Sequence, residues 1–234
     1  MHDKVCLITG VGDGTGSSVA RRFARDGYRV ALLARNKDRL RDLERELPGS
    51  KAFAFDLEDL DQLVCVCRQV KEEMGTPEVI VHNAVRATFK PFMEVDPTEL
   101  ERNFRVNTTS LLYMARELTP AMVERGSGAI VVTGNTSALR GVPNYALFAP
   151  TKAAQRIFAQ SLARELGPKG IHVAYVVIDA AIDTPWTRMP FNPDAPEDFF
   201  SKPDAIAEEV FHVANQDRST WSFDVELRPY GEKW

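Results

Sequence analysis

Residues 4–20 read KVCLITGVGDGTGSSVA, and this stretch decides the fold. A short apolar run ends at a threonine, four glycines follow of which Gly10, Gly14 and Gly16 have the decisive spacing, and a segment of helical character comes next. Glycines at a strand-to-helix junction let the backbone turn tightly and approach a pyrophosphate, which the first amides of the helix can bind. A tight turn without a ligand is the alternative. The context favours a nucleotide site formed by Thr9, Gly10, Gly14, Thr15 and Gly16.

The composition excludes several classes of protein. The chain has 234 residues, of which 44% are hydrophobic and 26% charged, with a net charge of −4. This balance predicts one globular dinucleotide-binding domain over residues 1–234, and the lack of a basic cluster argues against a nucleic-acid partner. No apolar run approaches the roughly 20 residues of a membrane helix. No signal peptide is evident and the three cysteines are typical of reduced thiols, so we expect a cytoplasmic protein without a metal site.

Short β-branched runs alternate with longer helical patterns along the whole chain. Such alternation indicates βαβ units and hence a doubly wound α/β Rossmann fold, with one seven-stranded, mainly parallel sheet covered by helices on both faces. The predicted strands are 4–9, 29–34, 52–56, 79–83, 129–134, 172–178 and 223–227. The predicted helices are 15–26, 37–47, 59–74, 97–126, 146–167 and 202–216. Residues 183–201, rich in proline and aromatic residues, are interpreted as a flap over a site.

The end of the second predicted strand should meet the adenosine ribose of a dinucleotide. No ribose-binding acid stands there, and Arg35 follows Ala34 instead. A guanidinium at this place can pair with a 2′-phosphate, which favours NADP(H) over NAD(H). Asp13 in the glycine stretch brings negative charge near the phosphates and argues the other way, and Arg35 could also be an ordinary solvated residue. NADP is therefore the predicted cofactor, with NAD as the alternative.

Five segments in order resemble the short-chain dehydrogenase/reductase family. They are the Thr-Gly-x-x-x-Gly-x-Gly spacing at 9–16, HNAV at 82–85, FRVN at 104–107, PTKAA at 150–154 and AIDT at 181–184. The resemblance implies cofactor contacts, on the adenine side at Asp56 and Leu57, in the turn at Asn83 and Ala84, and at the carboxamide from Ile182 and Thr184. It further implies that Lys152 binds the nicotinamide ribose and that Asn107 helps to hold a water in the proton path.

Two residues depart from the family pattern. Four residues before Lys152, where the family has its proton-transferring tyrosine, stands Phe148, and thirteen residues earlier Asn135 takes the place of its serine. Phenylalanine has no proton to give, and loss of a positioned acid costs about 10²–10⁴ in rate. The Asn135 amide could still donate a hydrogen bond to a developing alkoxide. Tyr145 is the first candidate for a substitute acid, and Lys152 itself and Asp179 are others.

Two functions from different classes fit these features. The first is an NAD(P)(H)-dependent oxidoreductase of the family with an atypical active site, in which the catalytic residues would be Lys152, Asn107, Asn135 and Tyr145. The second is a catalytically silent dinucleotide-binding sensor or scaffold subunit. Apolar residues of the flap favour a small apolar carbonyl or alcohol as substrate; they are Trp186, Met189, Phe191, Phe199 and Phe200. The resemblance also suggests a homodimer or homotetramer built from the long helices.

Overall fold

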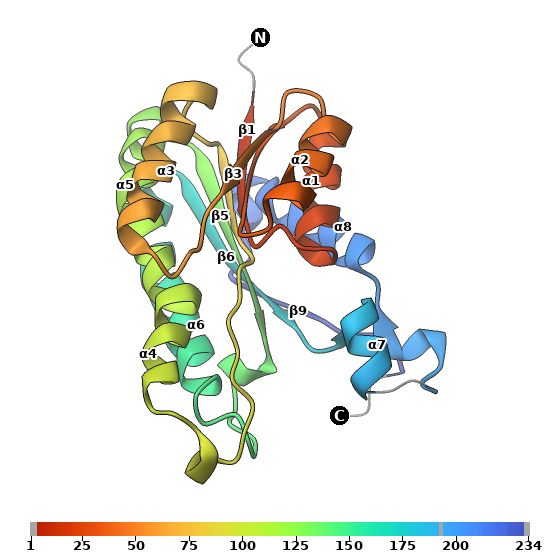
Figure 1. The fold of residues 1–234 in the computed structure, drawn as a ribbon. Coiled ribbons are helices and arrows are strands. Elements are labelled where there is room, and N and C mark those ends of the chain that lie inside the picture. Colours follow the sequence, from red (N-terminus) through yellow and green to blue (C-terminus); the bar gives the residue numbers. More distant parts are fainter. Residues whose placement is uncertain (1–3, 192–193, 232–234) are drawn as a thin grey trace.

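Three layers make up the fold, with one parallel sheet between two layers of helices (Figure 1). The computed structural model describes residues 4–191 and 194–231. The seven strands lie in the order β3-β2-β1-β4-β5-β6-β9, and every neighbouring pair is parallel. The predicted doubly wound Rossmann sheet is thus confirmed. The strands are β1 Val5–Thr9, β2 Arg29–Ala34, β3 Lys51–Ala54, β4 Val79–His82, β5 Gly128–Asn135, β6 Ile171–Ile178 and β9 Asp224–Leu227.

The helices cover both faces of this sheet because each presents an apolar stripe to it. One face is covered by α3 (Leu60–Met74), α5 (Ser110–Arg125) and α6 (Ala149–Leu166). The opposite face is covered by α1 (Thr15–Arg25), α2 (Lys37–Glu46) and α8 (Pro203–Ala214). Figure 1 shows the two groups on either side of the strands. Buried side chains alternate between the two cores along each central strand, so these strands are apolar throughout.

The long helix predicted at 97–126 is interrupted. It comprises α4 (Thr98–Phe104), a π-helical turn at Arg105–Thr109, and α5. The wider turn holds buried Asn107, and a single π-turn inside an α-helix is common at functional sites.

The helix predicted from residue 146 begins later, at Ala149. Pro150 lies in its first turn, where the missing amide hydrogen costs nothing. A start at 146 would place Pro150 beyond the first turn, where its ring and missing amide hydrogen oppose a helix. The left-handed φ of +70° at Asn144 lies before that predicted start.

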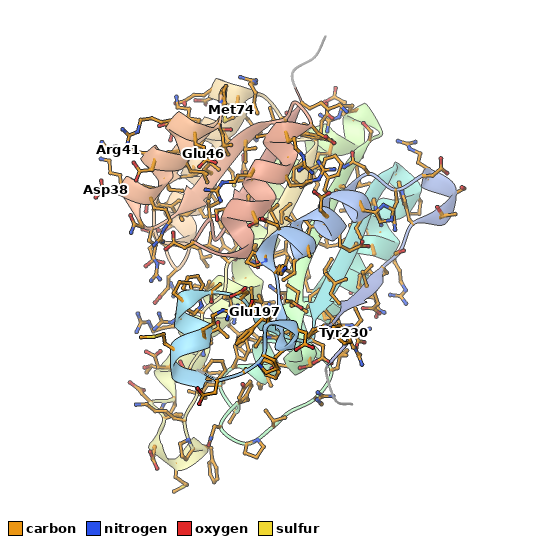
Figure 2. The ribbon with its side chains drawn as sticks, turned by 90° about the vertical axis from the view of Figure 1, so that its right-hand side faces the viewer. Asp38, Arg41, Glu46, Met74, Glu197 and Tyr230 are labelled. Carbon is orange, nitrogen blue, oxygen red and sulfur yellow. The ribbon has the colours of Figure 1, made fainter. Side chains whose placement is uncertain are left out.

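The segment predicted as a flap has more regular structure than expected. It contains α7 (Pro185–Phe191) and a two-stranded sheet of β7 (Ala181–Ile182) and β8 (Phe200–Ser201). The Arg188 guanidinium connects the two sides of this segment, since it lies 2.5 Å from Asp183, before α7, and 2.8 Å from Glu197, before β8. Figure 2 labels Glu197 here and Tyr230 in the C-terminal segment, whose phenol donates to Asp198 at 2.5 Å. Residues 192 and 193 and the Phe191 side chain lie outside the described residues.

Among the described residues, none of the helices is both long enough and apolar enough to cross a bilayer.

The core beneath α1 should depend on Phe23, which is fully buried and meets Tyr28 and Phe211 edge-on at ring distances of 5.1 and 5.0 Å. We expect Phe23→Ala to lower the free energy of unfolding by about 3–5 kcal/mol, because it leaves a cavity between these rings. Urea denaturation measures the change. Phe92→Ala is the matched control, since that ring is 70% exposed and its loss should cost under about 0.5 kcal/mol. Equal effects of the two variants would contradict the packing described.

Candidate cofactor and active site

A cleft of about 1030 Å³ opens at the carboxyl ends of the strands. It extends from the residues after β2 and β3, across the glycine loop, to the residues after β5 and β6. This is the edge at which open parallel sheets bind ligands. Every cofactor residue predicted from the sequence lines this cleft except Lys152, and Asn135 joins them. Asn107 and Tyr145 are not among its lining residues.

The glycine loop forms the middle of the cleft by close backbone contacts. Gly10 has a φ of +71°, and a Cβ there would lie 2.6 Å from the Cα of Ala84. A Cβ on Gly16 would lie 2.2 Å from the carbonyl oxygen of Gly10. Both contacts are with backbone, which cannot move aside as a side chain could. These two positions therefore require glycine for the β1–α1 turn to sit against the turn after β4.

The start of α1 fits a phosphate group. The helix begins at Thr15 without a side-chain cap, so its first amides lack intrahelical partners. The Thr15 hydroxyl is buried, lines the cleft, and has no hydrogen-bond partner among the described residues. A buried unpaired hydroxyl is costly, and a phosphate oxygen would satisfy it together with the amides. The donors at this helix start therefore suit the pyrophosphate of a dinucleotide.

Cationic side chains lie at the adenosine end of the cleft. Arg35 follows β2, is 72% exposed, and lies 3.9 Å from the Asp56 carboxylate. Arg39, on the first turns of α2, forms an ion pair with Asp13 of the glycine loop. That pair offsets the negative charge that the sequence places near the phosphates. The sequence analysis missed Arg39, although it follows Arg35 by four residues.

A hydrogen-bond network joins the ends of β1, β4 and β5 under the cleft. The Thr9 hydroxyl accepts from the amides of Asn83 and Ala84, both at 3.2 Å. The Asn83 side chain donates to the Gly10 carbonyl at 2.9 Å and accepts from the Thr133 hydroxyl at 3.0 Å. Asn83 and Ala84 thus position the floor of the cleft, which agrees with their predicted place beside the cofactor.

His82 continues this network into the interior. Thr9 already accepts two amides, so its hydroxyl donates to Nδ1 of His82 at 2.9 Å. Nε2 then carries the hydrogen and lies 3.3 Å from the Ser110 hydroxyl, which donates to the Val106 carbonyl at 2.7 Å. Burial, with a smaller effect of nearby Lys152, lowers the pKa of His82 to about 3. His82 is therefore a neutral structural residue that ties β1 to the π-turn.

Asn107 braces the site through each of its polar groups. Its side chain accepts from the Arg86 amide at 2.9 Å and donates at 2.8 Å both to the Arg86 carbonyl and to the Thr151 hydroxyl. Its own carbonyl accepts a hydrogen bond from the Gln155 side chain. Gln155 in turn accepts from Tyr175 at 3.1 Å. Gln155 was not predicted from the sequence. Its side chain donates to the carbonyl of Asn107, the residue expected to help hold a water.

Lys152 lies in the protein interior beside this brace. It is only 2% exposed, and its ammonium nitrogen donates to the Thr133 carbonyl at 3.1 Å. Burial lowers the pKa of Lys152 to about 7, because the charged form loses its hydration. Near pH 7 a substantial fraction of the side chain is therefore neutral, in contrast to an exposed lysine.

The end of the cleft beside β5 and β6 is formed by aromatic and small side chains. Phe148 and Phe89 both line it, with ring centroids 5.2 Å apart and ring planes at 81°. Asn135 accepts from the Ser137 amide at 3.1 Å through its Oδ1, which leaves its NH₂ group for a ligand. Asp179, a candidate acid in the sequence, lies 3.6 Å from the Arg228 guanidinium and is not among the lining residues.

Tyr145 lies at a different surface cavity. Its ring contacts Phe89 at a centroid distance of 4.5 Å and helps to line a hollow of about 830 Å³ with Phe92 and Val142. Its phenol has no hydrogen-bond partner among the residues that the structure describes. The structure therefore brings Phe89 between the two aromatic positions of the sequence motif, and Phe89 is a residue that the sequence analysis missed.

The flap closes over the glycine loop. A Cβ built on Gly14 would lie 2.9 Å from the Thr184 side chain and 3.5 Å from the Trp186 ring. The expected apolar lid is only partly formed, because Met189 is 81% exposed and Phe200 is buried in β8, where Arg188 covers its ring.

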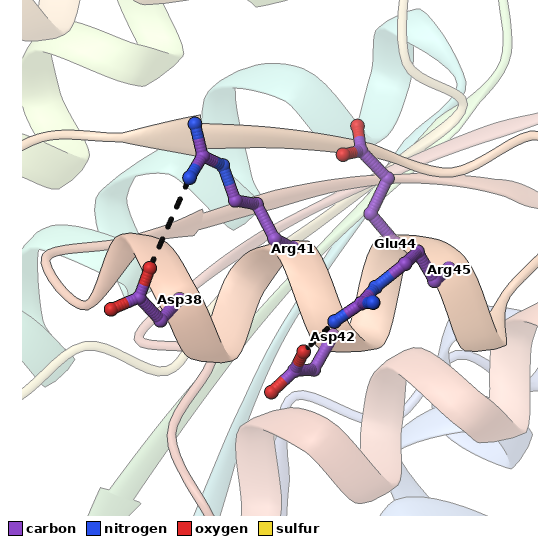
Figure 3. A pocket seen from close by; sticks show the side chains of 5 residues that line it. All are labelled: Asp38, Arg41, Asp42, Glu44 and Arg45. Carbon is purple, nitrogen blue, oxygen red and sulfur yellow. Dashed lines mark hydrogen bonds and ion pairs between the residues drawn. The ribbon is translucent and has the colours of Figure 1, made fainter.

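A hollow on α2, drawn in Figure 3, is lined by Asp38, Arg41, Asp42, Glu44 and Arg45. Its arginines face acids of the same helix, Arg41 toward Asp38 and Arg45 toward Asp42. The two arginines are thus paired with two acids, and the third acid, Glu44, accepts a hydrogen bond from the Ala52 amide at 2.9 Å. Across residues 4–191 and 194–231, no group of three or more His, Cys, Asp or Glu side chains could hold a metal ion.

Comparison with known proteins identifies the family. The family model described as short chain dehydrogenase matches residues 4–192. The chain belongs to this family. This short-chain dehydrogenase is 33% identical to D-erythrulose reductase of Gallus gallus over 168 residues. The matched segment covers 71% of this chain and 67% of that protein.

Solved structures give the same result over nearly the whole length. A metagenomic short-chain oxidoreductase in complex with NADP is 27% identical, with a TM-score of 0.84 over 97% of each chain. An alcohol dehydrogenase from the archaeon Thermococcus sibiricus, complexed with 5-hydroxy-NADP, is 28% identical with a TM-score of 0.86 over 98% of each chain. This short-chain dehydrogenase therefore belongs with NAD(P)-dependent oxidoreductases that act on small carbonyl and alcohol compounds.

Burial of Lys152 should appear in the pH dependence of stability. Its pKa of about 7 lies below the 10.5 of an exposed lysine, so between these values the unfolded chain binds more protons than the folded chain. Stability should therefore rise with pH in this window, by up to about 1.4 kcal/mol per unit. From pH 7.5 to 9.5, we expect the free energy of unfolding of the wild type to rise by roughly 2 kcal/mol relative to that of Lys152→Met, which lacks the titrating group. Urea denaturation without nucleotide measures it, and parallel curves would contradict the assignment.

Proposed function

We propose that this chain is an NADP(H)-dependent oxidoreductase with an atypical active site, acting on a small apolar carbonyl or alcohol-type substrate. The observation that carries the proposal is the unpaired, buried Thr15 hydroxyl at the start of α1, between a cationic end and an apolar end of one cleft. Bound NADP(H) would supply or accept a hydride there.

The residues that would hold the cofactor follow the length of the cleft. The amides of the glycine loop, with Thr15, would hold the pyrophosphate, and Asp56 and Leu57 would border the adenine. Asn83 and Ala84 would form the floor, Ile182 and Thr184 would meet the carboxamide, and Lys152 would reach the nicotinamide ribose, as the family resemblance implies.

The preference for NADP rests on Arg35 and Arg39. Both line the adenosine end, and a guanidinium can pair bidentately with a 2′-phosphate. The two solved relatives bound to NADP and to 5-hydroxy-NADP support the same choice. Asp56 lies close to Arg35 and would compete for it, so NAD is the alternative.

The atypical part of the site is its proton supply. The register of the family motif assigns Phe148 and Asn135 to the positions of the usual tyrosine and serine. Phe148 is 2% exposed and packed against Phe89, so it provides shape and no acid. Asn135 would bind the substrate heteroatom through its NH₂ group. Of the substitute acids, Lys152 has the pKa suited to proton exchange, whereas Tyr145 would have to turn toward the cleft.

A second function is favoured by one observation, the hydrogen bond from Gln155 to the Asn107 carbonyl. With that carbonyl engaged by a side chain, a water-filled proton path past Asn107 is obstructed. The chain would then bind the dinucleotide without turnover, as a sensor or as a subunit of an assembly.

The oligomeric state belongs to the proposal too. Leu112 on α5 and Ile157 on α6 are exposed apolar residues on the two long helices that cover one face. Pairing of these helices in a homodimer or homotetramer would bury them. A cytoplasmic location is expected from the sequence.

The cofactor assignment is tested by tryptophan fluorescence titration with NADPH and NADH. We expect tighter binding of NADPH, and Arg35→Ser should weaken NADPH roughly tenfold or more while leaving NADH within about twofold. Arg41→Ser is the matched control, because Arg41 lies on α2 opposite Asp38 and outside the cleft lining. Absence of binding of both nucleotides would reject oxidoreductase and sensor alike.

The proton supply is tested by restoring the family residues. We expect Phe148→Tyr with Asn135→Ser to raise reduction of a ketone panel about 10²–10⁴-fold, because a positioned acid lowers the barrier by that amount. Stopped-flow measurement of NADPH oxidation gives the rates. Phe92→Tyr adds the same hydroxyl outside the cleft and should change nothing. Unchanged rates in the double variant, with NADPH still bound, would favour the silent binding protein.

A further inference from the structure

None of the described residues that line the apolar end of the cleft is suited to donate a proton to a substrate, and Lys152, the buried candidate acid, is not among them. Among the described residues that line it, none at this end carries a titratable side chain. The titratable lining residues are elsewhere or engaged, since Arg35, Arg39, Asp56 and Glu58 lie at the adenosine end, and Arg86 is held 2.8 Å from Glu99. A substrate bound here meets ring faces, small aliphatic groups and one amide.

The aromatic rings at this end form a corner. Phe89 and Phe148 stand at 81° to each other with centroids 5.2 Å apart, and Tyr145 packs against Phe89 from the side of the neighbouring hollow. The π face of an aromatic ring attracts an organic cation, most strongly where water is excluded. A neutral molecule of the same shape gains the apolar contact but not this attraction.

The charge change of the reaction separates two kinds of hydride acceptor. A ketone that receives a hydride becomes an alkoxide and needs a proton on oxygen, and none of the described residues that line this end can donate one. An iminium cation that receives a hydride forms a C–H bond, and the C=N π pair moves onto nitrogen as a lone pair. The product is a neutral amine, no proton is consumed, and the reduced nicotinamide that gives the hydride is oxidised.

We propose that this site reduces an apolar iminium cation, the nitrogen counterpart of a carbonyl compound, in preference to a ketone. The cation would lie against the ring of Phe89, which is 47% exposed whereas Phe148 is buried behind it, and would be reduced without an acid. The assignment rests on the proposed NADP(H) binding. It accounts for the aromatic lining and the missing proton donor together, and Asn135 would contact the substrate edge without transferring a proton.

Binding is tested first, without turnover. The probe is N-methyl-3,4-dihydroisoquinolinium, a permanent cation, and its neutral counterpart of the same bicyclic shape is 1-tetralone. Calorimetry uses the protein loaded with 1,4,5,6-tetrahydro-NADP, whose ring is uncharged and gives no hydride. We expect the cation to bind at least tenfold tighter than the ketone. Phe89→Leu should weaken the cation roughly fivefold to thirtyfold and the ketone under about threefold.

Matched variants and turnover complete the test. Phe92→Leu removes a ring outside the cleft and should leave both affinities unchanged. With NADPH, the iminium should be reduced at least about 100-fold faster than 1-tetralone, with a rate that stays level from pH 6 to 8 because no protein proton is used. Equal rates for the two compounds, or a Phe89→Leu variant that binds the cation as the wild type does, would overturn the inference.

A parallel NADPH titration separates the two levels of the proposal. If NADPH binds and the iminium neither binds nor reacts, the substrate assignment alone is rejected. If NADPH does not bind, the proposed function fails and the substrate assignment fails with it.

Discussion

The close backbone contact between the glycine loop and the turn after β4 is the constraint on which the site depends. No Cβ fits at Gly10, because it would lie 2.6 Å from the Cα of Ala84. None fits at Gly16 either, because that residue packs on the Gly10 carbonyl. The contact lets Thr9 accept two amides from that turn and lets Asn83 reach back to the loop. Three strand ends are thereby fixed to one another, and the cleft that would take the dinucleotide lies directly over them.

The sheet could be predicted closely from the sequence because its central strands are buried on both faces. Such strands are continuous β-branched runs, and β2 begins and ends as predicted while the other six differ by at most two residues at either end. The flap could not be predicted in the same way, since β7 and β8 are two residues each and seventeen residues separate them along the chain. The delayed start of α6 has a local cause that periodicity does not show, because Pro150 fits only in the first turn of the helix.

The residues of the candidate site also fall into those that could be predicted from local sequence and those that could not. Residues of the glycine loop and the strand ends could be predicted because their spacing reflects a local backbone geometry. Arg39, Gln155 and Phe89 could not, because each acts through a partner far along the chain, Asp13, Asn107 and Phe148 respectively. Tyr145 stands three residues before Phe148 and its ring contacts that of Phe148 at a centroid distance of 6.0 Å, yet only Phe148 lines the cleft, and Tyr145 lines another hollow. Sequence distance predicts neighbours inside a regular helix, and α6 begins only after both.

Burial sets the chemistry of the two ends of the cleft in opposite directions. At the adenosine end, Arg35 stays largely in solvent and keeps its charge for an anionic ligand. Beneath the other end, burial lowers the pKa of both His82 and Lys152, neither of which lines the cleft. The ring of Phe89 lines the cleft, is 47% exposed, and can contact a cation without carrying a charge of its own. A hydride transfer that neutralises its substrate there needs no proton donor, whereas one that creates an alkoxide does, and this difference is why the proposed acceptor is a cation.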